Sequence, residues 1–134
     1  MKKIKTALIS VSDKINLKPL LKVLTKNKVK IISSGGTYKE IKKLKFKCLE
    51  VSEFTNSPEI LEGRVKTLHP KIHAGILNKR KNKIHLKDLK KNNFENIDLV
   101  IVNFYPFEET LKSTKKHNKI VENIDVGGPT MVRS

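Results

Sequence analysis

Short apolar runs alternate along this chain with segments whose apolar residues recur at helical spacing. The runs at residues 6–11, 29–32, 46–51 and 98–104 are bounded by polar residues, which is typical of strands that are buried on both faces of a sheet. Such strands run parallel, and the helices between them cover the two faces. The pattern therefore predicts an α/β fold of three layers, a mostly parallel sheet flanked by helices, in one domain over residues 1–134.

The expected helices follow from apolar spacing and from signals at helix starts. The first helix should contain Leu17, Leu20, Leu21 and Leu24. Ser12 or Asp13 is its expected N-cap. Pro106 and Pro129 are expected to open two later helices, because proline is favoured at the first helical position. Residues 79–93 are nearly all polar, so they form either a surface helix or a mobile lysine-rich excursion.

The charge balance does not support a nucleic-acid partner when it is read residue by residue. The formal net charge is +16, from 29 basic and 13 acidic residues, yet only Arg64, Arg80 and Arg133 are arginine. Nucleic-acid surfaces usually rely on arginine for bidentate contacts, whereas the lysines here are spread over the whole chain. A nucleic-acid partner is therefore disfavoured, and lysine usage driven by A/T-rich codons is the favoured explanation.

The sequence also indicates the cellular compartment of the protein. The apolar runs are too short to span a membrane, and no apolar stretch of a secretory signal follows the basic N-terminus. The single cysteine, Cys48, excludes an internal disulfide and a multi-cysteine metal site. Because it falls in a predicted strand, Cys48 is expected to fill apolar space rather than act as a nucleophile. We expect a cytoplasmic protein that does not associate with membranes.

Two strand-to-helix junctions carry groups that can bind phosphate. Residues 10–14 (SVSDK) follow the first strand, and residues 34–37 (SGGT) follow the second. In a parallel sheet both junctions lie at the carboxyl edge, where hydroxyls, helix N–H groups and the Lys14 ammonium can meet one ligand. The alternative is that Ser12 and Thr37 only cap helices and the glycines only form a turn. Two such junctions at one edge favour a phosphorylated ligand.

The densest group of polar side chains is residues 64–73, RVKTLHPKIH. It combines a guanidinium, two ammonium groups, a hydroxyl and two imidazoles, which suit an anionic substrate and the stabilisation of developing negative charge. His69 and His73 are four residues apart, but Pro70 disrupts a helix between them and no HExxH pattern is present, so a metal site is disfavoured. The alternative is a solvated basic loop.

Two further groups of residues follow predicted strands or turns. Asn103 and Tyr105 end the run at 98–104 and present hydrogen-bonding tips at the carboxyl edge, whereas Phe104 is expected in the core. Asp125 precedes Gly127–Gly128, which places a carboxylate beside exposed backbone N–H groups. That arrangement can supply a general acid or base and an oxyanion hole; the alternative is that Asp125 only caps a helix or a turn.

Five stretches, SVSDK, SSGGT, EGRVKTLHPKIHAGIL, NFYPF and IDVGGPTMVRS, carry a resemblance to one family. The chain resembles the N-terminus of the bifunctional purine-biosynthesis family, AICAR transformylase/IMP cyclohydrolase, over essentially its whole length. RVKTLHPKIH and IDVGG are the specific blocks. The resemblance implies a methylglyoxal-synthase-like fold that closes the purine ring of 5-formamidoimidazole-4-carboxamide ribonucleotide (FAICAR) to give IMP and water. It implies no metal or organic cofactor, and it implies a homodimer.

The resemblance also implies roles for individual residues. Lys66, Tyr105 and Asp125 would surround the reacting groups, with Asp125 taking the amide proton, Lys66 stabilising charge or delivering a proton, and Tyr105 orienting or relaying a proton. The backbone of residues 126–128 would form the oxyanion hole. The substrate-binding residues would be Ser10, Ser12, Lys14, Ser34, Gly36, Thr37, Arg64, Thr67, Asn103, Gly127 and Gly128.

The sequence departs from the family at three places. It stops at Ser134, where family members continue with an alanine-rich segment carrying another lysine of the site, and it lacks the transformylase half. Ala74 stands where a glycine is usual. The expectation is therefore a cyclohydrolase domain that is incomplete at its C-terminus. Two alternatives stay open: a non-catalytic nucleotide- or phosphate-binding domain of the same fold, and a basic nucleic-acid-binding module.

Overall fold

The computed structural model, which describes residues 3–134, contains one parallel four-stranded sheet. Its strands are β1 (Thr6–Val11), β2 (Lys30–Ser33), β3 (Leu49–Glu50) and β4 (Leu99–Asn103). The strand order is β3-β2-β1-β4, so β1 is paired on both edges, and Ala7 lies opposite both Ile31 and Leu99. The predicted α/β fold with a parallel sheet is confirmed.

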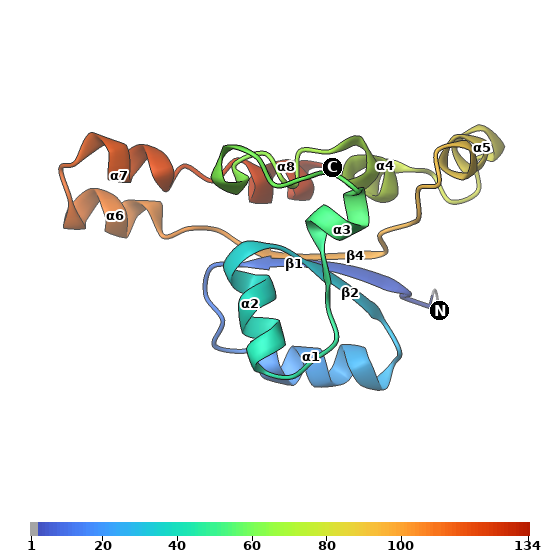
Figure 1. The fold of residues 1–134 in the computed structure, drawn as a ribbon, viewed down its shortest axis with the longest axis horizontal. Coiled ribbons are helices and arrows are strands. Elements are labelled where there is room, and N and C mark those ends of the chain that lie inside the picture. Colours follow the sequence, from blue (N-terminus) through green and yellow to red (C-terminus); the bar gives the residue numbers. More distant parts are fainter. Residues whose placement is uncertain (1–2) are drawn as a thin grey trace.

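Helices cover both faces of this sheet (Figure 1). Helices α1 and α2 lie on one face, and α3, α4 and α8 lie on the other. The bounds are α1 (Leu17–Lys26), α2 (Gly35–Lys43), α3 (Val51–Thr55), the 3-10 turn η1 (Leu61–Gly63), α4 (Pro70–Leu77), α5 (Lys83–Lys91), α6 (Phe107–Ser113), α7 (His117–Glu122) and α8 (Gly127–Arg133).

The alternation of side chains along the strands divides the core into two layers. Ala7 and Ile9 of β1 pack with the buried leucines of α1 and with Ile41 of α2. Leu8, between them in sequence, points to the other face and packs with Phe54 of α3, Ile72 of α4 and Met131 of α8. Successive strand residues point to opposite faces, so a strand between two helical layers must be apolar throughout. This explains why β1 reads as a continuous apolar run.

Several sequence predictions need correction at the boundaries. Helix α1 is preceded by Asn16 as its N-cap, not by Ser12 or Asp13, because the Asp13 carboxylate instead accepts the N–H of Ile15 in a local turn. Helix α8 begins at Gly127, two residues before Pro129. Residues 79–93 contain the surface helix α5, whose N-cap Asn82 accepts the N–H groups of the first turn. Of these two alternatives, the helix is therefore the one observed.

Two apolar predictions also differ from the structure. Within residues 46–51 only Leu49–Glu50 pair as a strand, because Val51 already begins α3 and packs into the core. Phe104 was expected in the core but is 51% exposed, since β4 ends at Asn103 and the chain leaves the sheet there. Both errors arise where an apolar run continues past the end of its strand.

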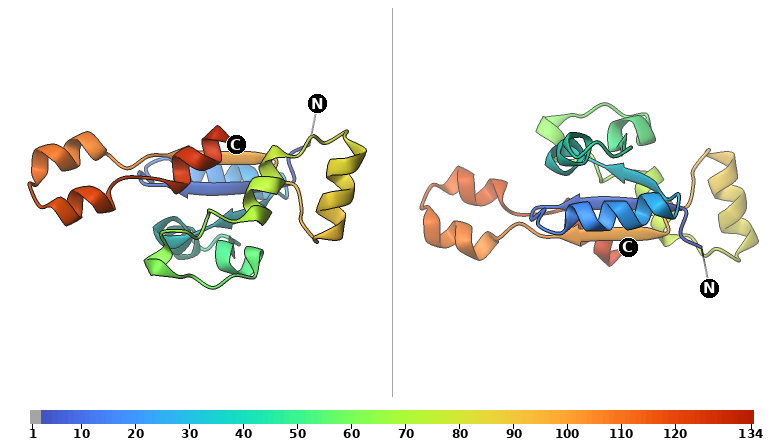
Figure 2. Two further views of the ribbon diagram at one scale, coloured as in Figure 1. Left: turned by 90° about the horizontal axis from the view of Figure 1, so that it is seen from above. Right: turned by 90° about the horizontal axis from the view of Figure 1, so that it is seen from below.

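The α6–α7 pair extends beyond the carboxyl ends of the strands, and α5 extends beyond the opposite end (Figures 1 and 2). Neither α6 nor α7 contains a buried residue. Among residues 3–134, no helix combines the length and the apolar character needed to cross a lipid bilayer.

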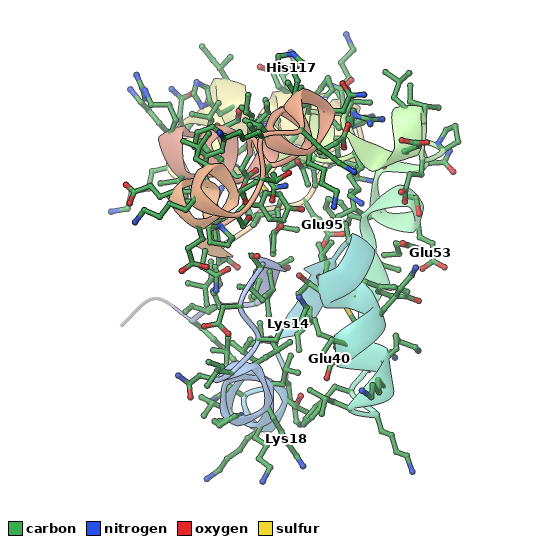
Figure 3. All side chains as sticks on the ribbon, turned by 90° about the vertical axis from the view of Figure 1, so that its left-hand side faces the viewer. Lys14, Lys18, Glu40, Glu53, Glu95 and His117 are labelled. Atoms are coloured by element: carbon green, nitrogen blue, oxygen red, sulfur yellow. The ribbon has the colours of Figure 1, made fainter. Side chains whose placement is uncertain are left out.

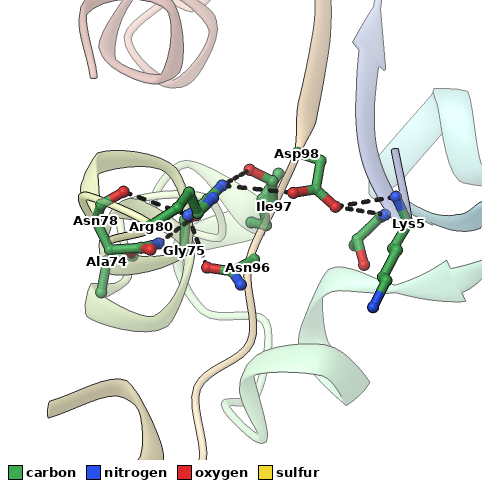
Figure 4. A network of polar contacts seen from close by, with 9 residues as sticks. Lys5, Ala74, Gly75, Asn78, Arg80, Asn96, Ile97 and Asp98 are labelled. Carbon is green, nitrogen blue, oxygen red and sulfur yellow. Dashed lines mark hydrogen bonds and ion pairs between the residues drawn. The ribbon is translucent and has the colours of Figure 1, made fainter. Parts of the chain in front are cut away.

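Arg80 organises the end of the molecule that carries α5 (Figure 4). Its guanidinium donates to the backbone oxygens of Gly75 at 3.0 Å and Ile97 at 2.6 Å, and to Oδ1 of Asn96 at 2.7 Å. Asp98 lies 3.7 Å away as an ion-pair partner, and its other oxygen accepts the N–H of Lys5 at 2.9 Å. The network therefore connects α4, the start of β4 and the start of β1.

Replacing Arg80 with alanine should lower the free energy of unfolding by about 2 kcal/mol, because hydrogen bonds from a charged donor to partly buried acceptors are lost. Urea unfolding followed by circular dichroism measures the change. Lys81→Ala is the matched control, since Lys81 is exposed. Equal stabilities of the two variants would contradict this role of Arg80.

Candidate functional site

The carboxyl ends of the strands open onto two adjoining cavities. The first, called here the α2 cavity, has a volume of about 250 Å³ and lies between the β1–α1 loop and the start of α2. The second, called the α8 cavity, has a volume of about 440 Å³ and lies between the loop at Arg64 and the start of α8. The residues that line both cavities are Ser10, Ser34, Lys66, Tyr105 and Asp125.

The structure brings together all the residues predicted for the site. Besides the five shared residues, the α2 cavity is lined by the predicted residues Ser12, Lys14, Gly36, Thr37 and Asn103. The α8 cavity is lined by the predicted residues Arg64, Thr67, Gly127 and Gly128. These residues come from five separate segments of the chain, so the shared edge of the sheet is what collects them.

The start of α2 can bind an anion in the α2 cavity. Its N-cap residue, Ser34, makes no side-chain capping bond within the described chain, so the first helical N–H groups are left for a ligand. A Cβ added at Gly36 would meet no atom within 4 Å, which shows that the backbone there faces open space. Figure 3 looks onto this edge and places Lys14 near its middle, with Lys18 on the side of α1 away from the sheet.

Thr37 and Asn103, which were predicted to bind substrate, also make hydrogen bonds to the backbone beside the α2 cavity. The buried Thr37 hydroxyl donates to the Val11 oxygen at 2.9 Å and accepts the Val11 N–H at 3.0 Å. The Asn103 side chain accepts the N–H of Asp13 at 3.1 Å and donates to its oxygen at 2.9 Å. Because these polar atoms bind backbone groups at the end of β1 and in the loop that follows it, both residues shape the cavity wall.

Lys66 lies between two glycines of unusual conformation. Gly35 has φ +54° and Gly63 has φ +83°, values that favour glycine. A Cβ built at either residue would lie within 2.8 Å of the Lys66 Nζ. The Lys66 ammonium therefore occupies a slot between two backbones, and it faces both cavities from there. Glu59, whose Oε1 is 3.6 Å from Nζ, completes its surroundings.

Arg64 is held by carboxylates across the α8 cavity. Its guanidinium donates to Glu62 at 2.9 Å and also pairs with Glu122 of α7. The hydrogen bond that Arg64 donates to Glu122, followed by the one it donates to Glu62, raises the pKa of Arg64, so the guanidinium is charged at any physiological pH. A ligand anion that binds Arg64 must therefore compete with Glu122 and Glu62.

The Asp125 carboxylate lies both at the start of α8 and at the two cavities. Its Oδ1 accepts the Gly128 N–H at 3.0 Å, so it stabilises the start of α8 as a capping residue does. It also faces both cavities beside Tyr105. The Gly128 N–H, predicted to belong to an oxyanion hole, is thus already bound by Asp125.

The two histidines of the RVKTLHPKIH block act as local hydrogen-bonding groups. His69 is the N-cap of α4, and its Nδ1 accepts the Lys71 N–H at 3.1 Å. The His73 ring lies 3.1 Å from the Thr67 oxygen and 2.8 Å from the Ser134 hydroxyl, so it connects the Lys66 loop to α8. Residues 3–134 contain no cluster of three His, Cys, Asp or Glu residues able to hold a metal.

Cys48 packs against the α1–α2 side of the core and is half-buried. Burial raises the pKa of its thiol to about 11, despite the opposing effect of Lys42. The thiol is therefore protonated at neutral pH, which agrees with a packing role rather than a nucleophilic one.

Sequence reasoning missed the carboxylates that hold the two site cations. Glu59, Glu62 and Glu122 were not predicted, although each pairs with Arg64 or Lys66. Glu59 and Glu62 lie close to these cations in sequence, which is a weak signal. Glu122 is 58 positions from Arg64 and carries none.

Comparisons with known proteins agree with the fold. The sequence model of the MGS-like domain matches residues 16–130. The bifunctional purine biosynthesis protein PurH of Prochlorococcus marinus (strain AS9601) is 55% identical over 129 residues, covering 96% of this chain and 25% of the relative. PurH of Acetivibrio thermocellus is 51% identical over 132 residues, with 98% and 26% covered. This chain therefore spans about a quarter of the length of these curated relatives.

A solved structure gives the same result in three dimensions. The crystal structure of ForH superposes with a TM-score of 0.81 at 30% sequence identity, covering 97% of this chain and 66% of that one. The match therefore extends over nearly the whole chain.

Proposed function

Because this chain belongs to the MGS-like domain family, we propose that it acts in purine biosynthesis as an IMP cyclohydrolase, closing the ring of FAICAR to give IMP and water. The observation that carries the proposal is the gathering of all the predicted site residues around two adjoining cavities. The names of the relatives support the purine pathway. Ring closure is the finer step, and it rests on the chemistry of the site.

The two cavities suit the two ends of a nucleotide. The α2 cavity offers the uncapped start of α2, the Lys14 ammonium and the hydroxyls of Ser10 and Ser12, which are groups that bind a phosphate monoester. The α8 cavity is larger, at about 440 Å³, and a heterocycle with its two substituents can be placed there. The phosphate would then anchor the ring beside Lys66 and Asp125.

The reaction needs one bond to form and one oxygen to leave. The carboxamide nitrogen of FAICAR attacks the formyl carbon, and the formyl oxygen becomes an alkoxide before it leaves as water. One proton comes from the carboxamide nitrogen and one from the formamido nitrogen, and both leave in the water. We assign acceptance of the amide proton to Asp125, stabilisation of the alkoxide and its protonation to Lys66, and orientation of the ring to Tyr105.

The direct test is to incubate the purified 134-residue chain with FAICAR and follow IMP by ultraviolet absorbance and chromatography. Turnover at a rate well above the uncatalysed reaction is the expected result. Circular dichroism and a thermal shift with added IMP provide the control, because a ligand that binds the folded state raises the melting temperature. A folded chain that is stabilised by IMP but yields no product would instead be a non-catalytic nucleotide-binding domain.

A binding measurement with nucleic acid tests the alternative of a nucleic-acid-binding module. Binding of single- or double-stranded nucleic acid with a steep salt dependence, undisturbed by excess IMP, would favour that alternative. The thermal shift with IMP would then be absent.

A further inference from the structure

Lys66 faces a third cavity besides the two described above. This α3 cavity, of about 180 Å³, lies between α3 and the loop that leads to η1. Among residues 3–134, only Ser34 and Lys66 line all three cavities. The Lys66 side chain is 24% exposed, and it lies where the three cavities meet. The position of the ammonium among the three cavities therefore depends on the groups that contact it.

Glu59 approaches Lys66 from the side of the α3 cavity. Its carboxylate lines that cavity and neither of the other two. It can therefore hold the ammonium at 3.6 Å without occupying the space of a ligand in the α2 or α8 cavity. Glu62 and Glu122 differ in this respect, since both line the α8 cavity and pair with Arg64 there.

The backbone is shaped to admit this ion pair. A Cβ at Gly63 would lie 2.5 Å from Glu59 Oε1 and 2.7 Å from Lys66 Nζ, so a side chain there would separate the two charges. Gly35 likewise leaves room for Nζ, since a Cβ there would lie 2.8 Å from it. With the Glu59 side chain 43% exposed, solvent weakens the attraction, and such a pair adds little to stability. Its effect is on the position of the ammonium.

We propose that Glu59 is a positioning residue for Lys66. From the side of the α3 cavity, it holds the ammonium where the α2 and α8 cavities meet. The proposal rests on the proposed function, in which Lys66 stabilises the departing oxygen. A preorganised charge is effective because it need not move during the reaction, and a misplacement of about 1 Å can cost up to roughly a hundredfold in rate.

Glu59→Gln tests this role because it removes the charge and keeps the size of the side chain. We expect kcat for FAICAR cyclisation to fall about 10- to 100-fold while KM changes less than about threefold. Glu59→Asp should recover part of the loss, since it restores a carboxylate slightly further from Nζ. Glu53→Gln is the matched control: Glu53 is exposed on α3, and Figure 3 shows it on the outer side of the molecule.

A second readout does not depend on turnover. Acetic anhydride modifies free lysine amines, and peptide mass spectrometry reports the rate at each lysine. The rate at Lys66 should rise at least about threefold in Glu59→Gln, because the amine is no longer held, and should be unchanged at Lys14. Glu53→Gln should change neither rate.

The two readouts separate failure of the proposal from failure of the proposed function. If the unmodified chain shows no turnover, ring closure is disproved for this chain, and the acetylation rate at Lys66 still decides the positioning role. A Glu59→Gln variant with the original acetylation rate at Lys66 overturns the proposal. A Glu59→Gln variant that keeps the original kcat also overturns the proposal. The same holds if its kcat/KM falls only because KM increases.

Discussion

Replacing Asp125 with asparagine is expected to reduce FAICAR turnover by about a thousandfold while leaving the free energy of unfolding nearly unchanged. The asparagine Oδ1 can still accept the Gly128 N–H at the start of α8, so the local structure is retained. The amide cannot accept a proton at neutral pH, so the base is lost. The measurement is kcat at saturating FAICAR together with urea unfolding.

Asp125→Ala separates the two uses of this carboxylate. The alanine variant should lose the same turnover and also about 1 kcal/mol of stability, because the N–H of Gly128 loses its acceptor. An asparagine variant that kept more than about a tenth of the turnover would show that Asp125 acts at the helix start and not as a base, since a general base contributes at least about a hundredfold.

Lys66→Met should likewise lower kcat by about a hundred- to a thousandfold, the range found when a single oxyanion-stabilising group is removed. The fold should survive, because the Glu59 carboxylate left behind is 43% exposed and stays hydrated. Stopped-flow or single-turnover kinetics with FAICAR measure the change in turnover, and thermal unfolding measures the stability of the fold.

Lys66→Arg is the informative control for this prediction. It keeps the positive charge, but a planar guanidinium is larger than an ammonium and the slot between Gly35 and Gly63 has no spare room. We therefore expect little recovery of turnover. Full activity of the arginine variant would contradict a positional requirement, and full activity of Lys66→Met would contradict any role in catalysis.

The parts of the fold that follow from local pattern were predictable from sequence. β1 reads as a strand because both of its faces are covered, and the leucines of α1 read as a helix because their spacing follows one face. The site residues could be grouped because parallel strands deliver their following loops to one edge. What the sequence could not show is which polar atoms were already bound. Thr37 and Asn103 are predicted substrate-binding residues whose polar atoms also hold the end of β1 and the loop that follows it.

The loop around η1 shows why side-chain partners resist prediction. Leu61 and Glu62 adopt positive φ values of +50° and +54°, although neither is a residue that normally signals this conformation. The path they impose brings Arg64 to Glu122, a pairing across 58 positions of sequence. Local pattern carries no record of such a pair, because it depends on where tertiary packing places α7 relative to the loop.

The pairing of β1 with β4 has a consequence for how the chain is made. Contacts between the two strands join residues about ninety positions apart, so one edge of β1 stays open until β4 has been synthesised. At ordinary rates of translation this lasts roughly 5 to 20 seconds. An open apolar edge is a template for association between nascent chains. The many lysines of the intervening segment give such chains a common positive charge, and their mutual repulsion opposes aggregation on the ribosome.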